Sequence, residues 1–168
     1  MSFANYAWKL KENVDEELVT SLSSESGVSK NLVRLCVERG IQTAEEMQEF
    51  LSPTPHLIHN PFLLHDMEKA VGRIQEAIEN GELIHIYGDY DADGITSTTI
   101  LYETLEMLGA QVSYYLPNRF IDGYGPNIPA FERALEEGHT LIITVDCGIA
   151  AHEPICYAME NGCDVILT

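Results

Sequence analysis

Short apolar runs alternate with amphipathic helical patterns from residue 83 onward, and this alternation limits the folds open to the chain. The runs are rich in Ile, Val, Leu and Tyr, and most of the helical patterns between them end at a glycine. Strands are expected at 83–87, 111–116, 141–145 and 164–167, and helices at 96–108, 127–137 and 150–160. This β-α-β repeat predicts the α/β class, with a mostly parallel sheet flanked by helices.

A different pattern precedes the repeat. Three short amphipathic helices are expected at 15–24, 29–39 and 43–51, with Ser29 and Thr43 as N-caps. The proline-bearing stretch from Ser52 to Pro61 is interpreted as a linker. Asp66 is expected to cap a longer helix that ends at Asn80-Gly81. We therefore expect a small helical segment with its linker at 1–60 and the α/β domain from 61 to 168.

Polar residues follow three of the expected strands at the point where each strand ends. Asp89, Asp91 and Asp93 follow the first strand, Asn118 and Arg119 the second, and Asp146 the third. Sites in open α/β sheets lie at the carboxyl ends of the strands, so these loops should meet at one edge. Carboxylates this close repel one another unless a cation lies between them, and divalent cations prefer such oxygen ligands.

The charge of the chain restricts how it could bind an anionic polymer. The formal net charge of the 168 residues is −18, and beyond Gly94 the only Lys or Arg residues are Arg119 and Arg133. A simple electrostatic grip on nucleic acid is therefore unfavourable, and an anionic substrate would need bound metal. The N-terminus has no signal-peptide pattern, no run of apolar residues is long enough for a transmembrane helix, and the four cysteines form no C-x-x-C. These features predict a cytoplasmic protein without membrane contact.

The aspartate cluster alone permits several interpretations. Its D-x-D-x-D-G pattern resembles the start of an EF-hand loop, but Ile100 occupies the position of the bidentate Glu. The segment Asp91-Ala-Asp-Gly-Ile95 also resembles the signature of haloacid dehalogenase-type phosphatases, although no Lys follows Lys69 to hold the phosphate. A solvated acidic turn remains the plain structural alternative.

Four segments together favour another family. Tyr87-Gly-Asp-Tyr-Asp-Ala-Asp-Gly-Ile-Thr-Ser97 resembles the first motif of the DHH phosphoesterase superfamily. Pro117-Asn-Arg-Phe-Ile-Asp-Gly-Tyr-Gly-Pro126, Thr144-Val-Asp-Cys-Gly-Ile149 and the lead-in from Leu63 to Ala70 are similar to its RecJ branch, the single-stranded-DNA-specific exonucleases. The superfamily's Asp-His-His would follow Thr168 directly. We therefore interpret residues 61–168 as the first part of a DHH-type domain, and the chain as an N-terminal fragment.

The resemblance implies a site for two divalent metal ions, Mn²⁺ or Mg²⁺. By position in the motifs, Asp91 and Asp93 would each ligate a metal and Asp146 would bridge the two. Asp89 would lie in the outer coordination sphere. These three inner carboxylates are the expected catalytic residues, because two such cations would activate the phosphoryl group and the attacking water. Cys147 is expected to be a small buried residue, since hard cations do not favour thiolate.

Residues of the second-strand loop are the candidates for binding substrate. Arg119 is the best candidate for a phosphate contact, because a guanidinium binds phosphate oxygens in a bidentate fork. Gly123 and Gly125 should shape a loop that approaches the substrate backbone. Tyr124 could stack on a base, although packing within the loop is an equal alternative. Thr96 and Ser97 are expected to open a helix, and His85 to be a hydrogen-bonded core or edge histidine.

The resemblance implies a function in the complete protein and a different expectation for residues 1–168. The complete protein would hydrolyse single-stranded DNA from its five-prime end in recombination and repair. Residues 1–168 alone should bind metal weakly and show little nuclease activity. Two alternatives remain open: another phosphoesterase of the superfamily, acting on oligonucleotides, cyclic dinucleotides or pyrophosphate, and a non-catalytic module that binds a partner.

Overall fold

The computed structural model describes residues 14–168 and leaves the first thirteen residues of the expected N-terminal segment, including Lys9 and Lys11, outside the described part. The chain divides into two compact units, Met1–Leu63 and Leu64–Thr168. Each unit has its own hydrophobic core, and each is described separately below. Among the described residues, no helix combines the length and the apolar character that crossing a bilayer requires.

The first unit contains three short helices, α1 (Glu16–Ser26), α2 (Lys30–Glu38) and α3 (Ala44–Leu51). Their apolar faces bury a small core of Val19, Leu22, Val33, Cys36 and Met47. Thr43 forms a full capping box with Glu46, as its position predicted. Ser29 occupies the N-cap of α2 but makes no side-chain capping hydrogen bond. Two 3₁₀ turns follow: η1 (Pro55–Leu57) lies within the expected linker, and η2 (Pro61–Leu63) begins at its last residue.

The second unit begins with α4 (Met67–Asn80), which Asp66 precedes in the left-handed conformation at φ 57°. The carboxylate of Asp66 makes no capping hydrogen bond, because an N-cap normally has extended backbone that aims its side chain at the first turn. After α4 the chain alternates strands and helices as expected. The elements are β1 (Leu83–Tyr87), α5 (Ala92–Met107), β2 (Gln111–Tyr115), α6 (Ile128–Glu136), β3 (Leu141–Thr144), α7 (His152–Glu160) and β4 (Asp164–Leu167).

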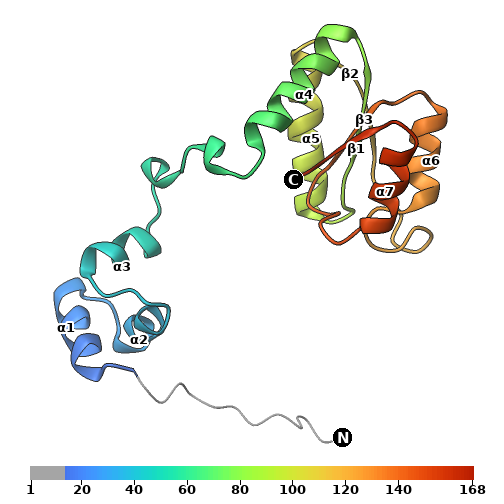
Figure 1. The fold of residues 1–168 in the computed structure, drawn as a ribbon. Helices are drawn as coiled ribbons and strands as arrows, with labels where there is room; N and C mark the ends of the chain where they lie inside the picture. The colour runs from blue at the N-terminus through green and yellow to red at the C-terminus, as the bar shows by residue number, and fades with distance from the viewer. Residues whose placement is uncertain (1–13) are drawn as a thin grey trace, which may run out of the picture. The chain divides into compact units, whose positions relative to one another are not determined.

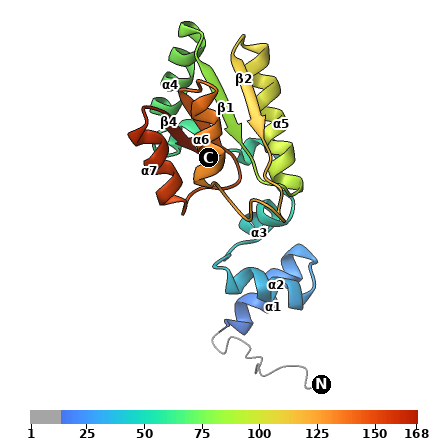
Figure 2. The same ribbon diagram turned by 90° about the vertical axis from the view of Figure 1, so that its right-hand side faces the viewer.

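The four strands form one fully parallel sheet in the order β2-β1-β3-β4. Helices cover both faces, so the predicted α/β class is confirmed (Figure 1). One core contains Ala77 of α4 and Leu105 of α5, and the other contains Phe131 of α6 and Ala158 of α7. Figure 2 shows α5 beside β2 and α6 near α7. Because all four strands are parallel, their carboxyl ends lie at the same edge of the sheet.

Helix α5 begins four residues before the predicted start at residue 96. The cause is Asp91, whose carboxylate accepts hydrogen bonds from the backbone N–H groups of Asp93 and Gly94 and so caps the helix early. Thr96 and Ser97 consequently do not open the helix. Their hydroxyls donate to backbone carbonyls one turn earlier, at Ala92 and Asp93.

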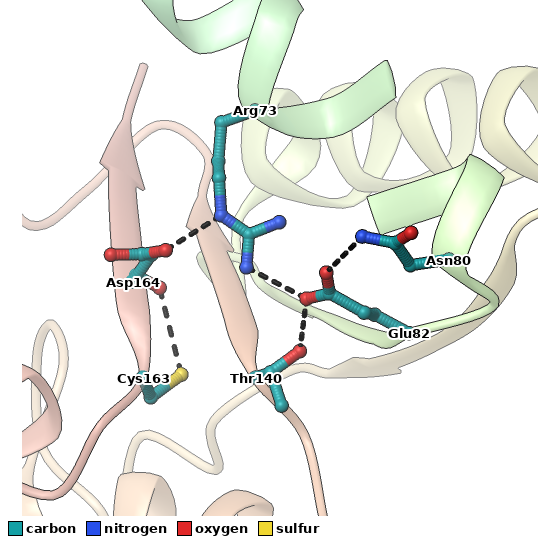
Figure 3. A network of polar contacts seen from close by, with 6 residues as sticks. All are labelled: Arg73, Asn80, Glu82, Thr140, Cys163 and Asp164. Carbon is teal, nitrogen blue, oxygen red and sulfur yellow. Dashed lines mark hydrogen bonds and ion pairs between the residues drawn. The ribbon is translucent and has the colours of Figure 1, made fainter. Parts of the chain in front are cut away.

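A polar network holds the opposite edge of the sheet, where the strands begin (Figure 3). Arg73 of α4 donates from Nε to Asp164 at 2.6 Å and from Nη2 to Glu82 at 2.7 Å. Glu82 also accepts from the Thr140 hydroxyl at 2.5 Å and from Asn80 at 3.4 Å. Glu82 lies just before β1, Thr140 just before β3, and Asp164 opens β4. The network thus joins α4 to three strands.

A second polar cluster lies between the sheet and α6. His139 Nδ1 donates to the Ala134 carbonyl at 2.8 Å, since a carbonyl only accepts. Ser113 Oγ is hydrogen-bonded to His139 Nε2 at 2.8 Å and to His85 Nδ1 at 2.7 Å. His85 is therefore a hydrogen-bonded core histidine, as predicted. Burial, with His139 and Arg133 nearby, lowers the pKa of His85 to about 4.

Candidate metal centre

Two glycines allow the acidic loop after β1 to pack against the start of α5. A Cβ on Gly88 would lie 2.1 Å from the Thr98 hydroxyl oxygen and 2.8 Å from a methyl carbon of Leu116. A Cβ on Gly94 would lie 2.5 Å from the Asp89 carbonyl oxygen. Neither position has room for a side chain. The close approach fixes Asp89 and Asp91 against the first turn of the helix.

Three carboxylates from two loops meet at this edge of the sheet. One ligand oxygen from each of Asp89, Asp91 and Asp146 lies within 4.8 Å of the other two. Asp89 is buried, with 4% of its surface exposed, and accepts a hydrogen bond from the Tyr90 backbone N–H at 2.7 Å. Asp146 follows β3 and has φ 59°, in the left-handed region where Asn and Asp occur more often than most other residues with a side chain. The two loops thus converge at one edge of the sheet, as the parallel β-α-β pattern predicted.

The electrostatics of the cluster favour a bound cation. Asp146 is exposed, but desolvation by the surrounding loops and the charges of Asp91, Asp93 and Asp89 raise its pKa above the usual value. Within residues 14–168 the structure gives these carboxylates no ion pair. A divalent cation would supply the missing positive charge, and carboxylate oxygens are ligands that Mg²⁺ and Mn²⁺ prefer. The donor set therefore fits a hard divalent metal.

Asp93 occupies a different place from the other acids. It lies in the first turn of α5 and is exposed, and it is outside the group whose oxygens converge. Its charge still reaches Asp146, since it is among the causes of the raised pKa of that carboxyl group. The structure brings Asp89 closer to Asp91 and Asp146 than the sequence predicted. The assignment of Asp93 as a metal ligand and Asp89 as an outer residue stays a prediction.

The loop after β2 brings the predicted substrate residues beside the acidic loop. The Arg119 guanidinium carbon lies 5.3 Å from the centroid of the Tyr90 ring, and Tyr90 packs edge-to-face with Tyr124 at 6.5 Å. Asp122 organises the start of this loop by accepting from the Tyr115 hydroxyl and from the Asn118 backbone N–H. Those two hydrogen bonds lower the pKa of Asp122 below its ordinary value.

The two glycines of the loop adopt positive φ, 77° at Gly123 and 79° at Gly125. These angles allow the loop to turn back toward the sheet. The Gly125 carbonyl accepts a hydrogen bond from the buried Tyr87 hydroxyl at 2.8 Å, which fixes the returning end. Burial raises the pKa of Tyr87, so this hydroxyl remains a donor at any physiological pH.

A cavity of about 480 Å³ adjoins Asp146 on the side toward β4. Tyr124 and Gly125 line it from one loop, and Gly148 and Ile149 from another. Cys147 also lines it, and its thiol lies 3.8 Å from the Tyr87 carbonyl oxygen. Burial raises the pKa of Cys147 to about 11, so it is a neutral thiol and a poor ligand for a hard cation. This agrees with its expected role as a small buried residue.

Sequence reasoning did not identify Tyr87, Tyr90 or Asp122 as parts of the site. The pattern predicts Tyr87 only as the last residue of a strand, yet its hydroxyl supports the substrate loop. Tyr90 stands between two predicted site residues, which was a signal in the motif itself. Asp122 lies within the Pro117–Pro126 segment, but nothing in the sequence indicates its partner Tyr115, which comes from the strand before the loop.

Comparison with known proteins places this architecture in a family. Residues 83–168, slightly more than half of the chain, match the model described as the DHH family, N-terminal domain. The chain belongs to the DHH family. The match spans all four strands and includes Asp89, Asp91, Asp93 and Asp146. It also includes the loop that carries Arg119.

Similar proteins agree with this assignment. The chain is 45% identical over 161 residues to the single-stranded-DNA-specific exonuclease RecJ of Bacillus subtilis, covering 96% of this chain and 20% of that protein. A crystal structure of exonuclease RecJ bound to manganese matches with TM-score 0.59 and 41% identity, covering 62% of this chain and 27% of that one. RecJ from Thermus thermophilus in complex with Mg²⁺ matches with TM-score 0.52 and 26% identity, covering 90% of this chain and 18% of that one. The chain is thus a RecJ homologue that spans about a fifth of the length of the Bacillus protein.

Proposed function

We propose that the whole protein is a metal-dependent exonuclease that hydrolyses single-stranded DNA from its five-prime end in recombination and repair. The observation that carries the proposal is the meeting of three carboxylates within 4.8 Å at the carboxyl edge of a DHH-family sheet. The one guanidinium that the structure places against the acidic loop within residues 14–168, that of Arg119, supports a phosphate-containing substrate. The cytoplasm is the proposed compartment, and four free cysteines are consistent with it.

The acidic residues would hold two divalent ions, Mn²⁺ or Mg²⁺. We assign Asp91 and Asp93 as ligands of one metal each and Asp146 as the bridge, with Asp89 close enough to Asp91 and Asp146 to contribute directly. When bound, the two cations polarise the phosphoryl group and lower the pKa of the attacking water. Asp146 must be deprotonated to serve, and its raised pKa makes metal binding weaken at acidic pH.

The remaining residues would orient the substrate. Arg119, which already contacts the Tyr90 face, would direct its N–H groups to a phosphate oxygen pair. Gly123 and Gly125 let the loop approach the sugar–phosphate backbone, because no side chain projects from either. Tyr124 is 71% exposed and could stack on a base.

The acidic cluster offers two metal ions four carboxylates at most. A Mg²⁺ or Mn²⁺ ion takes about six ligands, so water, substrate or other protein groups would supply the rest. We propose that a polypeptide of residues 1–168 binds metal weakly and has little nuclease activity. Robust metal-dependent digestion of single-stranded DNA by this polypeptide, abolished by Asp91→Ala, would contradict that.

The test uses the protein expressed from its whole gene. With Mn²⁺, it should release nucleotides from single-stranded DNA labelled at the three-prime end, starting at the five-prime end, and should leave duplex DNA largely intact. Asp91→Asn and Asp146→Asn should each reduce the rate at least a hundredfold, whereas Glu103→Gln, on the exposed face of α5, should have no effect. Parallel assays with cyclic dinucleotides and with pyrophosphate as substrates test the other phosphoesterase activities. Preferential hydrolysis of either compound would overturn the proposal.

A further inference from the structure

The ring of Tyr90 lies between two elements of the candidate site. It follows Asp89 and precedes Asp91, and it is half-buried. The Arg119 guanidinium carbon lies 5.3 Å from the centroid of this ring. The Tyr124 ring packs edge-to-face against it, with 6.5 Å between the ring centroids and an interplanar angle of 78°. Tyr90 thus joins the acidic loop to both predicted substrate-binding side chains of the loop after β2.

The substrate loop needs such a contact because much of it is exposed. Phe120 is 96% exposed, Ile121 82% and Tyr124 71%. The hydrogen bonds of Asp122 hold the start of the loop, and the Tyr87–Gly125 hydrogen bond holds its end. Arg119 lies near the exposed part of this loop, and its guanidinium stacks on the Tyr90 ring. A long, flexible side chain without such a contact would sample many rotamers.

The backbone of Tyr90 has a separate role from its ring. The backbone N–H donates to the Asp89 carboxylate at 2.7 Å, and this bond does not depend on the side chain. Removing the ring should therefore leave the geometry of the carboxylates intact while it releases Arg119 and Tyr124. The two functions of this residue can be separated by substitution.

We propose that Tyr90 is a positioning residue for substrate, which holds Arg119 and Tyr124 beside the metal centre through its aromatic face. This rests on the proposed phosphodiesterase function. Cation–π and edge-to-face contacts of this kind together account for a factor of about ten in affinity. The loss of the ring should therefore raise KM for single-stranded DNA about tenfold, with kcat within about twofold of the original.

The variants are compared in the protein expressed from its whole gene. Tyr90→Leu should show the rise in KM, while its Mn²⁺ affinity stays within about twofold. Tyr90→Phe keeps the ring and should restore KM to within about twofold of the unsubstituted protein. The matched control is Tyr114→Leu, which removes a similar edge-to-face pair with Tyr102 at 5.5 Å, on β2. That control should leave KM unchanged.

A double substitution tests the partner. In an Arg119→Leu background, Tyr90→Leu should add less than about a threefold further rise in KM, because the residue it positions is already absent. If the rise in KM of the double variant equals the product of the two single-variant rises, the proposal is overturned. An unchanged KM in Tyr90→Leu, equal losses in Tyr90→Leu and Tyr90→Phe, or a loss confined to kcat would also overturn it.

The outcomes separate this proposal from the proposed function. If the unsubstituted protein hydrolyses DNA and Tyr90→Leu behaves normally, only the positioning role fails. If the unsubstituted protein does not hydrolyse DNA, the proposed function fails, and fluorescence anisotropy with a hydrolysis-resistant phosphorothioate oligonucleotide still tests the role. A tenfold weaker Kd in Tyr90→Leu supports it, and an equal Kd contradicts it.

Discussion

Arg73 should be a main determinant of stability in the α/β unit, although it lies at the edge of the sheet away from the candidate site. Its ion pair with Glu82 is only about one-fifth exposed on each side, and a charge-assisted hydrogen bond in such a place contributes about 1.5–3 kcal/mol. Its pair with Asp164 is more exposed, at 62% for the carboxylate, and adds about 0–1 kcal/mol. We expect Arg73→Met to lower the free energy of unfolding by about 2–3 kcal/mol.

Urea denaturation followed by far-ultraviolet circular dichroism measures this change. The matched control is Arg34→Met, which breaks the exposed Arg34–Glu16 pair in the first unit and should cost no more than about 1 kcal/mol. A double-mutant cycle of Arg73→Met with Glu82→Gln should give a coupling energy of about 1.5 kcal/mol or more. A loss from Arg73→Met no larger than that of the control would refute the reasoning.

The same network predicts a pH dependence. Hydrogen bonds from Arg73 and Thr140 lower the pKa of Glu82 in the folded state. A carboxyl group with a lowered pKa stabilises the fold above its unfolded pKa and loses this contribution as the pH falls through the folded value. The difference between the original protein and Arg73→Met should therefore shrink as the pH falls below about 4. A constant difference from pH 7 to pH 3 would contradict the assignment.

Three further predictions concern the α/β unit. The pKa of buried His85 is about 4 in the fold and 6.5 in model peptides, so between these values the unfolded chain binds a proton that the folded chain does not. The free energy of unfolding should therefore fall by about 3 kcal/mol from pH 6.5 to pH 4. His85→Gln should remove this pH dependence, and substitution of the exposed His65 by Gln should not. Gly94→Ala should lower the free energy of unfolding by about 1–3 kcal/mol, because the added Cβ would clash with the Asp89 carbonyl. Urea denaturation measures this change, and an unchanged urea midpoint would contradict the close contact between Gly94 and Asp89. Without metal, Asp146→Asn should raise the melting temperature, because it removes a negative charge that the neighbouring aspartates repel. The same substitution should abolish the increase in melting temperature that Mn²⁺ produces. A lower melting temperature without metal would contradict this prediction.

The α/β alternation was predictable because each strand and helix carries its own local pattern. The strand at 83–87 was predicted to the residue, since the apolar run ends where glycine and the carboxylates begin. The start of α5 was not, because the aspartates fit a loop and a helix cap equally well. Only the hydrogen bonds of Asp91 distinguish the two.

The candidate site was partly predictable for a related reason. Parallel strands bring their carboxyl ends to one edge, so the approach of Asp146 to Asp91 followed from topology. The relative places of Asp89 and Asp93 did not follow, because they depend on how the loop turns at Gly88 and where the helix begins. The Arg73 network joins residues that are up to 91 positions apart, and no local pattern indicates such a contact.

Mn²⁺ binding measured by electron paramagnetic resonance tests the central claim most directly, because free Mn²⁺ gives a signal that is lost on binding. In the protein expressed from its whole gene, the account predicts saturable Mn²⁺ binding, competition by Mg²⁺, and loss of this binding in Asp91→Asn and in Asp146→Asn. Glu103→Gln, an equal change of charge on α5 away from the cluster, should bind as the unsubstituted chain does. Equal Mn²⁺ binding by all four proteins would contradict the metal centre.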